Sequence, residues 1–125
     1  TRNPNALLMQ TRHEDKYQLA SDIKKDFKEE IEVDSWGGPL NILEFSPKGI
    51  NKAYALNYLL KAMRKSPDDL IAFGDEHNDT EMLELAKTGY AMKNASPVLL
   101  PHANEQIEWT NEEDGVARKL QELLL

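Results

Sequence analysis

The chain has 125 residues, of which 40% are hydrophobic and 30% are charged, a balance typical of globular rather than disordered proteins. A formal net charge of -7 argues against nonspecific binding to nucleic acid or to an anionic membrane, because both depend on Lys and Arg. The chain contains no Cys, which excludes disulfides and Cys-ligated zinc, and no apolar run approaches the roughly 20 residues that span a bilayer. We therefore expect a cytoplasmic protein.

The N-terminal part of the chain predicts a β-α-β-β arrangement. The apolar run 6–9 is typical of a short strand, and apolar residues recur at helical spacing from about Glu14 to Glu30. Two extended runs, 31–33 and 40–45, flank a Trp-Gly-Gly-Pro turn, which indicates a hairpin. A Ser-Pro-Lys-Gly segment at 46–49 then marks a joint to a different pattern.

Beyond this joint, helices and strands are predicted to alternate. In chain order we expect a helix over 53–63, a strand over 70–73, a helix over 80–86, a strand over 90–92, a short helix from Ser96, a strand over 106–109 and a closing helix over 116–124. Gly89 fits a left-handed position just past the end of the second of these helices. The alternation predicts a parallel sheet with right-handed crossovers, and therefore an α/β fold.

The turn after the expected strand 70–73 carries the most informative residues. Gly74-Asp75-Glu76-His77-Asn78-Asp79 places three acids, a histidine and a carboxamide directly after the apolar run. Carboxylates this close together repel one another unless a cation or a proton lies between them, and oxygen ligands suit a hard ion such as Mg²⁺. In an open parallel sheet, ligands bind beyond the carboxyl ends of the strands, where this turn is expected to lie. We therefore expect a phosphate-processing metal site.

Four segments of the chain resemble the motifs of a known family. GDEHNDTEML is similar to the Gly-Asp-x-x-Asn-Asp motif, the fourth signature of the haloacid dehalogenase superfamily, in its Cof-like sugar phosphatase branch. Residues 45–52 resemble the segment that leaves the family's inserted cap and carries its third-motif lysine. Residues 90–95 resemble a g-x-A-M-x-N-A loop of this branch, and residues 113–117 resemble its E-D-G-V-A segment. The resemblance therefore extends over about residues 44–120.

The resemblance implies that the chain is a C-terminal portion of such a protein. Residues 1–46 would be the end of an α+β cap domain, and residues 47–125 the C-terminal half of a Rossmann-like core. Family members use the first aspartate of an Asp-x-Asp motif as nucleophile, but no two aspartates of this chain are two residues apart. The strand with that nucleophile would lie beside the strand ending at Phe73. We therefore expect an exposed sheet edge, which pairs with the missing N-terminal half or with a second copy of the chain.

Position by position, the resemblance also implies roles for five residues. Asp75 would be the carboxylate ligand of Mg²⁺, and Asp79 would bind the coordination shell of the metal or orient its water and the motif lysine. Lys52 would be that lysine and would neutralise the nucleophile and the transferred phosphate, so Lys52 and Asp79 are the expected catalytic residues. Asn78 would help to hold the phosphoryl group or the hydrogen bonds of the site. Asn94 would help to frame the entrance to the site.

Each of these residues also has an ordinary structural interpretation. An Asp-x-x-Asn-Asp turn is typical of a helix N-terminus with acids in its first turn. Lys52 could be a solvated surface lysine, with Lys48 as the next candidate for the motif position, and Asn94 could simply form a turn. Glu76 and His77 occupy variable positions of the motif, and we expect both to face solvent.

The expected function is that of a C-terminal portion of a Mg²⁺-dependent phosphatase. The intact protein would hydrolyse a small phosphomonoester, such as a sugar phosphate, through an aspartyl-phosphate, and the portion alone would be inactive. One alternative is part of a phosphomutase, which shares much of this site. Another is a non-enzymatic module that keeps the fold and binds a partner. None of these hypotheses includes a nucleic-acid or membrane partner.

Overall fold

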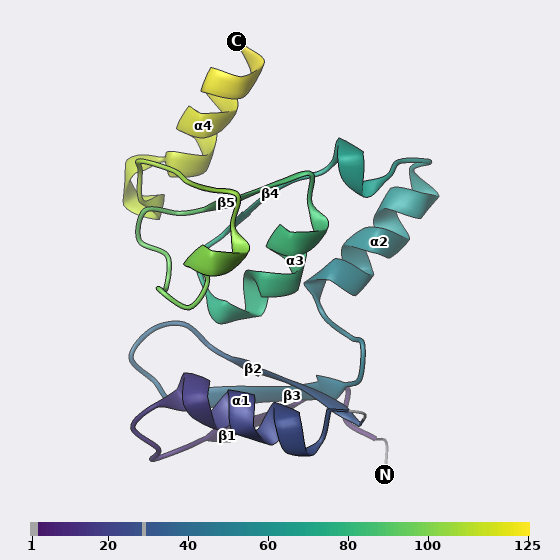
Figure 1. Cartoon of the computed structure of the whole chain (residues 1–125), viewed down its shortest axis with the longest axis vertical. Helices are drawn as coiled ribbons and strands as arrows, with labels where there is room; N and C mark the ends of the chain where they lie inside the picture. The colour runs from purple at the N-terminus through teal and green to yellow at the C-terminus, as the bar shows by residue number, and fades with distance from the viewer. Residues whose placement is uncertain (1–2, 29) are drawn as a thin grey trace.

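Two three-stranded sheets organise the chain in the computed structural model, which describes residues 3–28 and 30–125. The strands of the first sheet are β1 (Leu7–Gln10), β2 (Ile31–Ser35) and β3 (Ile42–Pro47), and those of the second are β4 (Ile71–Gly74), β5 (Thr88–Ala91) and β6 (Glu105–Gln106). The α-helices are α1 (Lys16–Asp26), α2 (Lys52–Ala62), α3 (Thr80–Leu85) and α4 (Gly115–Leu124). In Figure 1 the first sheet and α1 lie at one end of the molecule, and α4 projects from the other end towards the C-terminus.

The first sheet is antiparallel, with strand order β1-β3-β2. Helix α1 begins at Asp15, whose side chain accepts the N–H groups of residues 17 and 18 and so caps the helix. The helix covers one face of the sheet, where Ala20, Val33 and Leu43 form a fully buried core. The observed β-α-β-β order and the β2–β3 hairpin are those predicted, although the expected helix also included residue 29, which lies outside the described residues. The assignment of residues 1–46 to a cap domain stays a prediction.

A buried lysine organises the turn between β2 and β3. Lys16 is 6% exposed, and its Nζ donates to the carbonyl oxygens of Trp36 (2.5 Å), Gly38 (3.0 Å) and Leu40 (3.3 Å). Burial of an ammonium group is costly unless its hydrogen bonds are replaced, and these carbonyls replace them. The turn is therefore tied to α1 rather than left as a free loop.

The second sheet is parallel, with strand order β4-β5-β6. Its core is formed by Ala72, Leu83, Ala86 and Leu99, which join β4, α3 and the segment after β5. The parallel sheet with its helices confirms the predicted α/β fold class. Strand β4 is an edge of this sheet in the described part of the chain, and Ile71 on it is 42% exposed.

The prediction of a left-handed Gly89 after α3 is wrong. Gly89 lies within β5 opposite Ala72, and it is absent from the residues with positive φ. A Cβ atom at this position would lie 2.6 Å from the carbonyl oxygen of Leu83. Glycine is therefore required here because α3 approaches the sheet closely, which is a tertiary reason rather than a local one.

The region after β5 is less regular than predicted. Instead of an α-helix from Ser96, the chain forms turns and a single 3₁₀ turn over Leu100–His102. The N–H group of Ser96 donates to the carbonyl oxygen of Asp75 at 2.8 Å, so this serine is bound to the turn after β4. The expected strand over 106–109 is also shorter, since β6 has two residues. Among the helices in the described ranges, none is both long and apolar enough to cross a membrane.

Candidate functional site

The turn after β4 folds back on itself through Asp79. This aspartate is 4% exposed, and its Oδ2 accepts the N–H groups of Asp75 (2.9 Å) and Glu76 (3.2 Å). A Cβ atom on Gly74 would lie 2.7 Å from the Cβ of Asp79, so the close approach requires a glycine at the end of β4. The other oxygen, Oδ1, accepts a hydrogen bond from the ammonium group of Lys52.

Lys52 reaches this turn from the first residue of α2. The helix is capped by Asn51, whose side chain accepts the N–H group of Tyr54 at 2.9 Å. A cation in the first turn of a helix opposes the helix dipole by roughly 0.3–1 kcal/mol, and the ion pair with Asp79 offsets this cost. Lys48, the other candidate, pairs instead with Glu32 at 3.3 Å. The structure therefore brings Lys52, and not Lys48, to the acidic turn.

Asp75 lies beside this ion pair. Within residues 3–28 and 30–125, no other residue forms a hydrogen bond or ion pair with its carboxylate. Burial raises the pKa of Asp75, and the charges of Asp79 and Glu76 raise it further, although Lys52 acts in the opposite direction. A carboxylate in such surroundings is stabilised by a bound cation.

These residues fit part of a Mg²⁺ site. Asp75 offers a carboxylate for direct coordination, whereas both oxygens of Asp79 already accept hydrogen bonds, from Lys52 and from the backbone. No group of three or more His, Cys, Asp or Glu residues in the described ranges is placed to hold a metal ion. Mg²⁺ requires six oxygen ligands in a near-octahedral arrangement, which waters, substrate and other protein segments commonly complete.

Two hollows meet at Lys52. The first, which we call the aspartate hollow, has a volume of about 380 Å³ and is lined by Lys52, Phe73, Asp75, Asp79, Met92 and Asn111, among others. The second, which we call the sheet hollow, has a volume of about 330 Å³ and lies between the antiparallel sheet and the start of α2. Its lining includes Asp34, Glu44, Ser46, Asn51, Lys52 and Asn78. Asn78 therefore lines the sheet hollow, whereas Asp75 lines the aspartate hollow.

Asn94 lines neither hollow. It lies in the turn after β5, where its side-chain oxygen accepts the N–H group of Asn111 at 3.3 Å. Asn111 itself lines the aspartate hollow. Asn94 thus contacts a residue in the wall of the aspartate hollow, and its expected role in framing the entrance stays a prediction.

The prediction that Glu76 and His77 face solvent is wrong. The hydroxyl of Tyr17, on α1, donates to Oε1 of Glu76 at 2.8 Å and accepts a hydrogen bond from Ser96 at 3.2 Å. The ring of His77 packs edge-to-face on Tyr17, and its Nδ1 lies 3.1 Å from the Oγ of Ser35 on β2. Burial of this imidazole lowers its pKa. Both residues therefore hold the turn against the antiparallel unit, a role with no local sequence signal because their partners are remote in the chain.

Comparisons with known proteins identify the family of the chain. The sequence profile of the haloacid dehalogenase-like hydrolase family matches residues 1–120. The 5-amino-6-(5-phospho-D-ribitylamino)uracil phosphatase YitU of Bacillus subtilis (strain 168) is 38% identical over 117 residues, which are 94% of this chain and 43% of the relative.

Two solved structures have the same fold. The SMU.1108c protein of Streptococcus mutans UA159 matches with a TM-score of 0.81 and 34% identity, over 95% of this chain and 44% of that protein. A HAD/COF-like hydrolase of Plasmodium vivax matches with a TM-score of 0.78 and 26% identity, over 95% of this chain and 41% of that protein. The chain spans less than half the length of each of these relatives. By sequence profile and by structure, the chain belongs to the haloacid dehalogenase-like hydrolase family, in its Cof-like branch.

Proposed function

We propose that the chain is the C-terminal portion of a Mg²⁺-dependent phosphatase that hydrolyses a small phosphomonoester. The observation that carries this proposal is the ion pair of Lys52 with buried Asp79 at the carboxyl end of a parallel strand, next to the carboxylate of Asp75, which is unpaired among the described residues. The relative from B. subtilis is named as a phosphatase of a phosphorylated ribityl compound, which supports a sugar-like phosphate as substrate.

Each site residue of this chain would have a separate role in phosphoryl transfer. A bound Mg²⁺, held in part by Asp75, would neutralise charge on the phosphate oxygens. The ammonium group of Lys52 would stabilise the same charge from the side of α2, and Asp79 would hold that ammonium group and the N–H groups of the turn in place. The carboxamide of Asn78, one residue from Asp79, would donate to the phosphoryl group. Asn94 would keep Asn111 in the wall of the aspartate hollow.

The nucleophile would come from another segment of the same protein. Strand β4 exposes the backbone groups of one edge, and a further strand paired there in parallel would end beside Asp75. An aspartate at the end of that strand would complete the metal site and form the aspartyl-phosphate. Alone, the chain would be inactive and would associate through this edge, either with that segment or with a second copy. A single monodisperse monomer in sedimentation velocity would contradict this use of the edge.

The two alternative functions are those of a non-enzymatic binding module and of part of a phosphomutase. A non-enzymatic module would be favoured if these 125 residues, which contain no Asp-x-Asp motif, were the whole product, whereas an upstream coding segment with that motif would favour the enzyme. A phosphomutase would share the metal and phosphate residues and stays a prediction. The cytoplasmic location also stays a prediction.

The proposed function is tested by Asp75→Ala in the intact protein, meaning this chain together with the segment that supplies the nucleophile. We expect loss of Mg²⁺-dependent phosphate release by at least about 100-fold, because removal of a metal ligand removes stabilisation of charge in the transition state. Asp68→Ala, at an exposed acid on the 3₁₀ turn Pro67–Asp69, is the matched control and should retain activity. Full turnover by Asp75→Ala would refute the proposal.

A further inference from the structure

The sheet hollow lies where the rest of a bound phosphomonoester would extend. Lys52 lines both hollows, so a phosphate held near its ammonium group borders the sheet hollow as well. The volume of about 330 Å³ is within the range of small-molecule pockets. The wall opposite Lys52 and Asn78 is formed by the antiparallel sheet, through Asp34 on β2 and Glu44 on β3.

Strand alternation explains why two acids share this wall. Val33 and Leu43 are buried in the core with α1, and successive strand residues point to opposite faces. Asp34 and Glu44 therefore point away from α1, and they are directly opposite each other in the β2–β3 register. Like charges in this relation destabilise a sheet unless something compensates them.

The nearby lysines pair with other carboxylates and compensate Asp34 only in part. Lys24 pairs with Glu32 and with Glu81, both at 3.3 Å, and Lys48 also pairs with Glu32. In the described part of the chain, the carboxylate of Asp34 has neither an ion pair nor a hydrogen bond. Burial, reinforced by the charge of Glu81, raises the pKa of Asp34 to about 6, although Lys24 acts in the opposite direction. The hollow therefore contains a half-buried carboxylate that no donor in the described part of the chain binds.

Glu44 is held in a defined position. Its Oε2 accepts the indole N–H of Trp36 at 2.8 Å, which orients the carboxylate from the same face of the sheet. Ser46 and Asn51 add polar groups to the lining. The wall is thus rich in acceptors and negative in charge, while the cation on the other side, Lys52, is paired with Asp79.

We infer that the sheet hollow selects phosphomonoesters whose alcohol portion is neutral or cationic and rich in hydroxyl or amino donors, with Asp34 and Glu44 excluding a second anionic group. This inference rests on the proposed function and adds the substrate class. Hydroxyl or amino donors would form hydrogen bonds with the carboxylate of Asp34, whereas a carboxylate or second phosphate would meet two like charges in a partly desolvated site.

The test is a comparison of two substrates in the intact protein. Glucose 6-phosphate and 6-phosphogluconate carry the same phosphate, and only the second has a carboxylate at its far end. We expect kcat/KM to favour glucose 6-phosphate by at least about tenfold, since tenfold corresponds to only about 1.4 kcal/mol. Asp34→Asn should reduce this preference by about tenfold, chiefly through a lower KM for 6-phosphogluconate, and Glu44→Gln should reduce it by a smaller factor. If neither sugar phosphate turns over, inhibition constants against p-nitrophenyl phosphate hydrolysis report the corresponding preference in binding.

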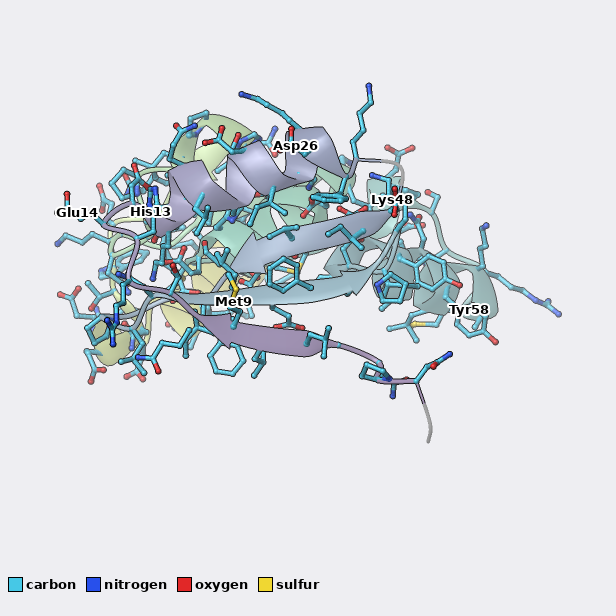
Figure 2. All side chains as sticks on the ribbon, turned by 90° about the horizontal axis from the view of Figure 1, so that it is seen from below. Met9, His13, Glu14, Asp26, Lys48 and Tyr58 are labelled. Carbon is cyan, nitrogen blue, oxygen red and sulfur yellow. The ribbon has the colours of Figure 1, made fainter. Side chains whose placement is uncertain are left out.

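The control is Asp26→Asn, which removes the same charge from an exposed residue at the end of α1, outside the hollow (Figure 2). It should leave the preference unchanged. An unchanged preference in both Asp34→Asn and Glu44→Gln, or a wild-type preference for 6-phosphogluconate, would overturn the inference. Failure to hydrolyse p-nitrophenyl phosphate with Mg²⁺ would instead contradict the proposed function itself, so the two failures are distinguishable.

Discussion

The turn after β4 has two sides with different tasks. Asp75 and Asp79 lie on the side of the aspartate hollow, where Asp79 is paired with Lys52 and Asp75 is unpaired in the described structure. Glu76 and His77, between them in sequence, contact Tyr17 and Ser35 of the antiparallel unit. The difference shows that consecutive residues of one motif can line a hollow and contact a second structural unit separately. A position that varies within a family motif can therefore still make specific structural contacts in one member.

The two sides of the turn also differ in how their charged groups are stabilised. On the first side a half-exposed cation and a buried anion compensate each other, and a second anion remains available for a metal. On the other side the carboxylate of Glu76 is bound by a neutral tyrosine hydroxyl, which holds it without forming an ion pair. Mutations on the two sides should consequently affect activity and stability in different proportions.

The largest effect is expected from Asp79→Ala. The substitution leaves Lys52 unpaired and removes the acceptor for the N–H groups of residues 75 and 76. We expect a loss of about 3 kcal/mol in the free energy of unfolding, measured by urea denaturation, together with loss of phosphate release. Asp68→Ala should change neither quantity appreciably. Wild-type stability in Asp79→Ala would show that the ion pair does not hold the turn.

A smaller effect is expected from Tyr17→Phe on the assembly side. The change removes the hydroxyl that donates to Glu76 and accepts from Ser96, at a cost of about 1 kcal/mol in the free energy of unfolding. Phosphate release should fall only a few-fold, because Asp75 and Lys52 are untouched. Tyr58→Phe is the matched control, since Tyr58 on α2 is 74% exposed (Figure 2). Equal stability of the two variants would show that the hydroxyl of Tyr17 does not stabilise the contact between the units.

The smallest stability effect, and one of opposite sign, is expected from Asp75→Asn without Mg²⁺. The folded protein raises the pKa of Asp75 above its ordinary value of 3.8, so ionisation favours the unfolded state. Stability contributed by protonated Asp75 is therefore lost as the pH rises from about this ordinary value through the raised pKa. Asp75→Asn should raise the melting temperature near neutral pH, and the gain should disappear towards acidic pH. A lower melting temperature at neutral pH would contradict this assignment of charge.

The predictable features were those with local causes or a motif. Helix α2 follows from its apolar spacing, and the position of Asp75 at the carboxyl end of β4 follows from the rule for parallel sheets. The proximity of Lys52 and Asp79 was implied by the resemblance, and the structure places them in contact. Nothing local predicts the contacts of Glu76 and His77, because these depend on where α1 and β2 pack.

The predictions for Gly89 and Ser96 were wrong for the same reason, because contacts between elements decide both conformations. The conformation of Gly89 is decided by the distance to Leu83 across the sheet, and not by the end of α3. Ser96 binds the backbone of Asp75 instead of starting a helix. The sheet hollow likewise depends on the packing of two units, which periodicity does not describe. Local patterns thus located the elements, while close approaches between them decided the remaining details.

The most direct measurement is calorimetric titration of Mg²⁺ into the intact protein and into its Asp75→Ala and Asp68→Ala variants. If the turn after β4 supplies a metal ligand, Asp75→Ala should weaken Mg²⁺ binding by at least about tenfold, and Asp68→Ala should bind as the wild type does. The same affinity for Mg²⁺ in Asp75→Ala as in the wild type would contradict a metal site at this turn.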